Sequence, residues 1–252
     1  DRFDYYNNVL HGWNISQVHS AAGLYWNDNF KVFALLAKRK NATLLSQDHG
    51  INNFVGLLPQ NDALPNQYKG TNQLMFVDYY CGWGKDKLND KWNHVDTKLN
   101  TKVINTGSVY LSKLKKYKKS EIDGKKMTLL FTSGPLRDFM ACLEEITPER
   151  NYIHRKNCTS FIKRLLMKYS GLHVLYKSFP CIDTRNDPIL EVFSKELDNG
   201  TVRLTTEHPT QLMPEVDIVF FDMISMGFAE ALQIGVPTLV YSNDFGYKEA
   251  SG

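Results

Sequence analysis

The stretch FFDMISMGFAEALQIGVPTLVYS, residues 220–242, decides the fold of this 252-residue chain. An apolar run ends at Asp222, a helix-like block of small and apolar residues follows from Ser225, and a second apolar run starts after Gly235 and Pro237. Short apolar runs on both sides of a helix are typical of buried parallel strands joined by that helix. The stretch therefore predicts a strand–helix–strand unit in a parallel α/β sheet.

The start of this helix is a candidate anion site. The loops that follow parallel strands meet at one edge of the sheet, where helix N-termini present free amides and a partial positive charge. Ser225 is expected to cap the helix, and Gly227, next to Met226, to let a ligand approach the backbone. Glu230 is expected on the exposed shoulder of the helix, where it would reach the hydroxyls of a ribose. The alternative is that Ser225 is only a cap and Glu230 begins an ordinary exposed helix face.

The chain before this stretch repeats the same alternation of strands and helices. We predict a five-stranded, doubly wound sheet that binds its ligand at the carboxyl ends of the strands. Its predicted strands are 127–134, 172–180, 202–209, 218–222 and 237–242, its helices are 158–171, 186–200 and 225–235, and 210–217 is a short helical turn.

The first half of the chain predicts a second, smaller α/β unit. It contains an amphipathic helix at 27–41 and three strands, at 42–50, 72–80 and within 101–114. A polar, Lys-rich stretch at 115–126 is the best candidate for a linker. We therefore predict two Rossmann-like domains, 1–118 and 119–252, and expect the first to be incomplete, as though earlier strands preceded Asp1.

Composition narrows the class of protein. The chain is 42% hydrophobic and 23% charged, with a net charge of +3, which is ordinary for a globular protein and too mild to predict nucleic-acid binding. We interpret the basic runs at 113–119 and 154–157 as solvated surface, with attraction to an anionic membrane or a phosphorylated substrate as the alternative.

The four cysteines form no CxxC pair, and no apolar run approaches the ~20 residues of a membrane span. A cytoplasmic protein is expected, with peripheral contact at the inner face of the membrane kept as an alternative.

The order of residues from Asp222 to Pro237, D-x-x-S-x-G-x-x-E-A-L-x-x-G-V-P, resembles the C-terminal half of GT-B glycosyltransferases. The likeness is greatest to bacterial surface-polysaccharide transferases, the group that includes capsule, Kdo and glycerophosphate transferases. It spans most of the chain but is carried by few motifs, and nucleotide-sugar epimerases of the same fold share E-A-L-x-x-G-V-P. Three further segments fit this resemblance: SQDHG (46–50), TGSVYLSKL (106–114) and FTSGPLRDF (131–139).

The resemblance implies a glycosyltransferase whose substrates are a nucleotide sugar and a glycan acceptor. It implies no separate cofactor, and polysaccharide-assembly proteins as partners. Because no D-x-D motif is present, and helix dipoles with cationic side chains can stabilise the leaving nucleotide, we expect a metal-independent enzyme.

The same resemblance assigns the donor phosphates to the second domain. Ser133 and Gly134 would hold them through backbone N–H groups, together with Arg137, Lys177 and the helix start at Ser225–Gly227. Arg137 has an equally plausible interpretation as a surface salt-bridge partner.

His208 precedes a proline at the end of a predicted strand. It would reach the nucleobase or the sugar of the donor, although a lone histidine is more often structural.

The acceptor side is predicted in the first domain, at Asp48 and His49. Neighbouring side chains in an extended segment point in opposite directions, so only one of the two would face the cleft. Asp48 is the candidate, as a general base in an inverting reaction or as a nucleophile in a retaining one. The alternative is that Asp48 caps the next segment and His49 bonds a backbone carbonyl.

One departure bears on the donor. Relatives that use CMP-sugars end the second strand of this domain in K-x-H-P, whereas this chain has YKSFP, with Lys177 retained and Phe179 in place of the histidine. This weakens the case for CMP-Kdo. A nucleotide-sugar 2-epimerase, a polyol-phosphate transferase and a non-catalytic module of a polysaccharide synthase stay open as alternatives.

Overall fold

The chain forms two compact units, Asp1–Val109 and Tyr110–Glu249, each with its own parallel sheet. The first predicted domain ended instead at residue 118. The computed structural model describes residues 1–21, 24, 27–47, 77–83, 101–117, 126–134, 148–178, 187–223 and 225–241.

The first unit is built on a four-stranded sheet in the order β1-β2-β3-β4, with every neighbouring pair parallel. The predicted parallel α/β class is therefore confirmed for this unit. Its strands are β1 (Gln17–Ser20), β2 (Thr43–Gln47), β3 (Tyr79–Gly82) and β4 (Lys102–Asn105), and its helices are α1 (Arg2–Val9) and α3 (Asp28–Arg39).

Helix α3 forms where its amphipathic pattern predicts it. Asn27 caps it by accepting a hydrogen bond from the Phe30 N–H at 3.1 Å, and basic residues occupy its last turn, where they face the negative end of the helix dipole. Its buried side is largely alanine, which brings the helix close to the sheet. The core between them contains Val18, Leu24, Ala34, Ala37, Leu44 and Tyr80.

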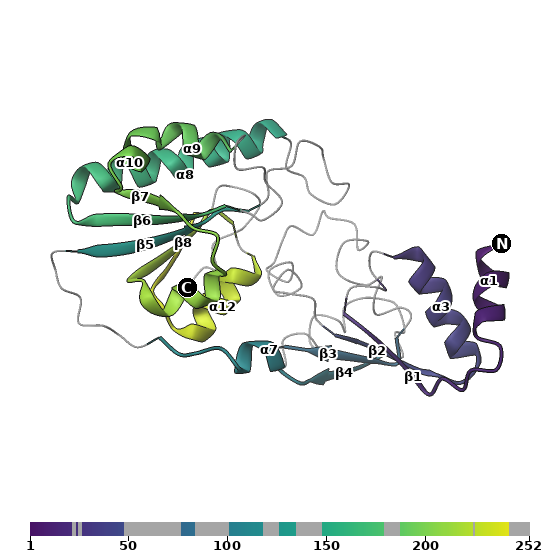
Figure 1. Ribbon diagram of the computed structural model, residues 1–252. Helices are drawn as coiled ribbons and strands as arrows, with labels where there is room; N and C mark the ends of the chain where they lie inside the picture. The colour runs from purple at the N-terminus through teal and green to yellow at the C-terminus, as the bar shows by residue number, and fades with distance from the viewer. Residues whose placement is uncertain are drawn as a thin grey trace, which may run out of the picture. The chain divides into compact units, whose positions relative to one another are not determined.

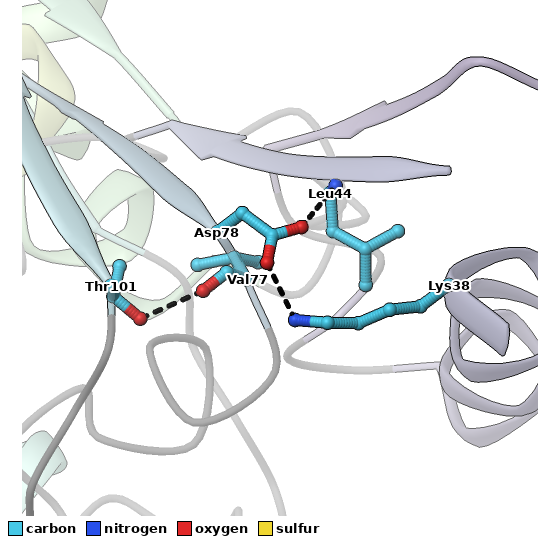
Figure 2. Close-up of polar contacts among 5 residues, drawn as sticks. All are labelled: Lys38, Leu44, Val77, Asp78 and Thr101. Atoms are coloured by element: carbon cyan, nitrogen blue, oxygen red, sulfur yellow. Dashed lines mark hydrogen bonds and ion pairs between the residues drawn. The ribbon is translucent and has the colours of Figure 1, made fainter. Parts of the chain in front are cut away.

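Asp78 fixes the start of β3 (Figure 2). Its N–H donates to the Leu44 carbonyl at 2.9 Å, and its Oδ2 accepts from the Leu44 N–H at 2.9 Å. Its Oδ1 accepts from Lys38 Nζ at 2.8 Å. Burial acts to raise the pKa of this carboxyl, but the bonds from Leu44 and Lys38 outweigh it and hold the pKa below its ordinary value. Strand β3 thus runs from Tyr79, and residues 72–76 of the predicted strand lie outside the described ranges.

The second unit contains a five-stranded sheet in the order β7-β6-β5-β8-β9, again parallel throughout. This confirms the predicted doubly wound sheet and its five strands. They are β5 (Met127–Thr132), β6 (Leu172–Lys177), β7 (Val202–Leu204), β8 (Ile218–Phe221) and β9 (Thr238–Val240).

Helices cover both faces of this sheet (Figure 1). Alternate residues of β5 point to opposite faces, so Leu129 and Phe131 enter one core with Cys158 and Ile162, while Leu130 enters the other. The first core lies under α8 (Pro148–Lys168), α9 (Pro188–Val192) and α10 (Ser194–Asp198). The second is closed by α11 (Pro209–Leu212), the 3₁₀ turn η3 (Met213–Glu215) and α12 (Met226–Ile234).

Two predicted helices differ in extent. Helix α8 begins at Pro148, before the predicted start at residue 158, because proline is compatible with the first turn of a helix and the polar residues after it do not interrupt one. The helix predicted at 186–200 is two short helices that meet at Phe193, a fully buried residue.

The start of the predicted linker packs against the second unit. The Tyr117 N–H donates to the Ile234 carbonyl at 2.7 Å, and Lys116 Nζ donates to the Gln233 carbonyl, so both bonds meet the end of α12. Leu114 and Tyr117 also pack on the core beneath that helix. Residues 115–117 are therefore not a free linker, and residues 118–125 lie outside the described ranges.

Candidate functional site

Helix α12 begins as predicted, with Ser225 at its N-cap in an extended conformation. The Ser225 hydroxyl makes no capping bond, although the Ser225 carbonyl accepts from the Phe228 N–H at 3.0 Å. The first amides of a helix lack partners within it, so those of Met226 and Gly227 are left by geometry as donors for an anion.

Gly227 has a role in packing that we did not predict. A Cβ placed on Gly227 would lie 2.9 Å from Cε1 of Phe221, a ring buried in the core. Its missing side chain therefore allows α12 to pack closely on β8, and the expected approach of a ligand to its backbone stays a prediction. At the other end, Gly235 adopts the left-handed conformation (φ 89°) that closes the helix.

Glu230 is buried rather than exposed, which corrects a prediction. Only 6% of the residue is accessible, and its Oε1 accepts a hydrogen bond from the Tyr110 hydroxyl at 2.7 Å. Tyr110 comes from the short helix α7 (Val109–Ser112). Burial, and then the hydrogen bond to Glu230, raises the pKa of Tyr110 to about 12, so the phenol stays protonated and keeps donating.

His208 lies at the start of α11, a helix that contacts α12. It caps α11, and its Nδ1 lies 2.7 Å from the Thr210 hydroxyl and also accepts the Thr210 N–H at 3.4 Å. The Thr210 side chain is near enough to Tyr110 to act against the rise in the pKa of the phenol. The structure thus brings His208 and Glu230, two residues singled out from the sequence, onto helices that contact each other. We did not predict a role for Thr210 or Tyr110, although Tyr110 lies inside the quoted TGSVYLSKL motif.

Ser133 and Gly134 lie at the end of β5, but their amides are already engaged. The Ser133 N–H donates to the Lys177 carbonyl at 3.2 Å, and the Gly134 N–H donates to Asp222 Oδ1 at 2.7 Å. The Ser133 hydroxyl lies 3.0 Å from the Tyr176 hydroxyl, inside the core. In this structure neither amide is available to a phosphate, so these two residues shape the edge of the sheet instead.

A buried polar cluster beside Gly134 was missed from the sequence. The run at 154–157 was interpreted as solvated surface, yet His154 and Arg155 are buried, and Arg155 is only 3% accessible. His154 Nε2 hydrogen-bonds the Asp222 carbonyl, and Arg155 Nη2 donates to the Gly134 carbonyl. A helical pattern would have placed these residues four and three positions before Cys158 on the inward side of α8.

The pKa of Asp222 is raised in this cluster. Burial raises it above the ordinary value, while the nearby Arg155 guanidinium, the Gly134 N–H and His154 reduce that rise. Within the described part of the chain, Arg155 Nε and Nη1 have no hydrogen-bond partner. The edge formed by β5 and β8 therefore contains a buried carboxyl group and a buried guanidinium group.

Lys177 ends strand β6, where Nζ donates to the Thr206 carbonyl at 3.3 Å and is only partly covered. This position leaves the ammonium group able to reach an anion at the carboxyl edge. Three other predicted site residues, Asp48, His49 and Arg137, and the departure at Phe179, lie outside the residues that the structure describes.

Two further observations concern the described ranges only. They contain no group of three or more His, Cys, Asp or Glu side chains arranged to hold a metal ion. None of their helices combines the length and the apolar character needed to cross a bilayer.

Comparison with known proteins shows which family and which fold the chain matches. The family model described as "LIC12162 family transferase" matches residues 3–247. A search of curated proteins finds no match. Solved structures of the GT-B fold match over nearly the whole chain at low sequence identity, which shows the fold and confirms that class.

Three of these structures illustrate the match. UDP-GlcNAc 2-epimerase from Neisseria meningitidis, bound to UDP-GlcNAc, is 16% identical with a TM-score of 0.57, and the match covers 95% of this chain and 62% of that one. MnaA from S. aureus, in complex with UDP, is 14% identical with a TM-score of 0.53, over 95% and 61%. TarM is 10% identical with a TM-score of 0.54, over 98% and 47%. The chain thus spans less than two thirds of each of these structures.

Proposed function

Because the chain belongs to the LIC12162 family of transferases, we propose that it is a glycosyltransferase that moves a sugar from a nucleotide-sugar donor to a bacterial surface polysaccharide or lipopolysaccharide glycan. We assign the donor to the second unit, at the carboxyl edge of its sheet. Ligands of open parallel α/β sheets bind at that edge, where helix N-termini and strand ends converge. We place the reaction in the cytoplasm, with a peripheral position at the membrane as the alternative.

One observation supports this assignment above the others: Glu230 on α12 accepts a hydrogen bond from Tyr110, and α12 contacts the helix α11 that His208 caps. The amides of Met226 and Gly227 at the start of α12 suit a phosphate, and a carboxylate one turn further along suits the hydroxyls of a nucleoside. Lys177 would supply a positive charge as the nucleotide leaves. Arg137 is kept as a second candidate for the same role.

Nucleotide binding tests the donor site directly. The full chain is heated with CMP, CDP, UDP or GDP, and a nucleotide that binds only the folded state raises its Tm. We expect one of the four to do so, and Glu230→Ala to abolish that shift while the ligand-free Tm changes less. A panel in which no nucleotide shifts the Tm would remove the proposal.

The reaction itself is tested on the acceptor side. We propose Asp48 as the general base or nucleophile, with His49 beside it, so Asp48→Ala should abolish sugar transfer and leave nucleotide binding intact. Full activity in this variant would remove Asp48 from the mechanism. Donors to compare are UDP-sugars, CMP-Kdo and CDP-glycerol, because the last would identify a polyol-phosphate transferase. Conversion of a UDP-sugar to its 2-epimer without any acceptor would identify an epimerase, and binding without turnover would identify a non-catalytic module.

A further inference from the structure

Tyr110 holds one of the two oxygens of the Glu230 carboxylate. Its hydroxyl donates to Oε1 at 2.7 Å. The other carboxylate oxygen, Oε2, is a second acceptor of the same side chain.

The burial of Glu230 increases the importance of its hydrogen bonds. Only 6% of the residue is accessible, and a carboxylate with so little contact with water depends on hydrogen-bond donors. The phenol of Tyr110 supplies one donor, and a hydroxyl of a ligand is the natural second. Without the phenol, the carboxylate is free to rotate about its last torsion, which is broad and weakly restricted in glutamate.

Tyr110 lies close to a second element. The Thr210 side chain is near enough to the phenol to act against the rise in its pKa, and the Thr210 hydroxyl lies 2.7 Å from His208 Nδ1. Thr210 and His208 come from the start of α11, whereas Tyr110 comes from α7. The hydrogen bond to Glu230 thus holds the phenol beside α11, although 46% of the Tyr110 residue is accessible.

We propose that Tyr110 is a positioning residue that makes the donor site selective for ribonucleotides over deoxyribonucleotides. It fixes the Glu230 carboxylate so that Oε2 accepts a hydrogen bond from a ribose hydroxyl. This rests on the proposed function, in which Glu230 binds the nucleoside. A site with a buried, oriented acceptor rejects a ligand that lacks the matching hydroxyl, because that acceptor is then left unpaired. An acceptor that can turn away discriminates less.

The experiment compares the affinities of ribonucleotides and deoxyribonucleotides for the wild-type protein and its variants. CMP, CDP, UDP and GDP and their 2′-deoxy and 3′-deoxy forms are titrated into the wild-type chain, Tyr110→Phe and Tyr152→Phe by calorimetry. Tyr152 is a matched control, because it is an exposed tyrosine of the same unit on helix α8. Removing the Tyr110 hydroxyl should weaken binding of the ribonucleotide about tenfold, as expected for a hydrogen bond to a charged group. Binding of the deoxy form should change much less, so the ratio of the two affinities falls. Tyr152→Phe should leave the ratio unchanged.

A third variant shows whether Tyr110 acts through Glu230. In a Glu230→Ala background, Tyr110→Phe should have no further effect on the ratio. A purely structural role would weaken ribose and deoxyribose ligands equally, and that outcome overturns the inference. So does a wild-type protein that binds nucleotides but does not discriminate between the two sugars, which would leave the proposed function standing. A wild-type protein that binds no nucleotide overturns both.

Discussion

Asp217 and Thr128 exchange two hydrogen bonds where strands β8 and β5 begin. The Asp217 N–H donates to the Thr128 carbonyl at 3.0 Å, and the Thr128 N–H donates to Asp217 Oδ2 at 2.7 Å. Asp78 and Leu44 make the same pair of bonds in the first unit. In both sheets an aspartate that immediately precedes an inner strand fixes its register on the neighbouring strand. Parallel strands need such a device because no hairpin turn sets their register.

We expect Asp78→Asn to lower the free energy of unfolding at pH 7 by about 1 kcal/mol, because a charged acceptor of two bonds becomes neutral. The pKa of Asp78 is lowered in the folded state from its ordinary value of 3.8. Its contribution is therefore complete above that value and is lost as the pH falls through the lower folded-state pKa. Urea unfolding at pH 7 and at pH 3 should show the difference between the two proteins shrinking in acid. Asp28→Asn, at an exposed pair with Lys31, is the control and should cost less; an equal cost would contradict the role given to Asp78.

Gly227→Ala tests the packing of α12 on β8. The added Cβ would meet the Phe221 ring at 2.9 Å, so α12 must shift, and overpacking of this kind costs about 1–3 kcal/mol, less the gain of up to ~1 kcal/mol in helix propensity. We therefore expect a lower Tm for the ligand-free variant in thermal unfolding. An unchanged or higher Tm would contradict the packing role given to Gly227.

Asp222→Asn should become more stable relative to the wild type as the pH rises. Burial raises the pKa of Asp222 in the folded state, so its contribution to stability is complete below the ordinary value of 3.8 and is lost as the pH rises through the raised folded-state pKa. Asparagine does not titrate, and its carbonyl can still accept from the Gly134 N–H. Urea unfolding between pH 4 and pH 8 should therefore show the variant gaining on the wild type as the pH rises. Asp198→Asn, at an exposed position of α10, should show no such trend. A difference between the Asp222 variant and the wild type that stays the same from pH 4 to pH 8 would argue against this assignment.

Lys177→Met tests the phosphate end of the donor site. Losing a charged donor should weaken binding of a nucleoside diphosphate about tenfold and leave the corresponding nucleoside unaffected. Calorimetry with UDP, CDP or GDP and the matching nucleoside gives both values. Lys156→Met, on the exposed side of α8, should change neither. A similar loss for diphosphate and nucleoside would show that Lys177 does not contact phosphate.

The regular part of the fold was predictable because its signals are local. Strands β5 and β8 are mostly apolar runs, β6 alternates between buried and more exposed residues, and α3 and α12 have caps and periodicity that a sequence displays directly. Strand β1 was missed, because QVHS is short and polar and is a strand only through pairing with β2. Such pairing is a tertiary effect that local propensity does not contain.

The candidate site was predictable only in outline. Glu230 and His208 stand in recognisable motifs, but the burial of Glu230 depends on Tyr110, which lies 120 positions away in the sequence. Arg155 looked like surface because it stands in a basic run, and its inward direction follows only from the orientation of α8 on the sheet. Side-chain surroundings of this kind come from packing between segments that are distant in the sequence. They determine the electrostatic environment of the site residues.

Residues 110–117 bind the end of α12 through hydrogen bonds and packing. They therefore determine where a separate polypeptide containing the second half of this protein can begin. A polypeptide that starts at residue 119 would lose the bond from Tyr117 to Ile234 and uncover the apolar surface beneath it. It would also lack the phenol that Glu230 depends on. Starting before Val109 keeps both, so the length of chain left in front of β5 would decide whether an isolated half retains the native surroundings of Glu230.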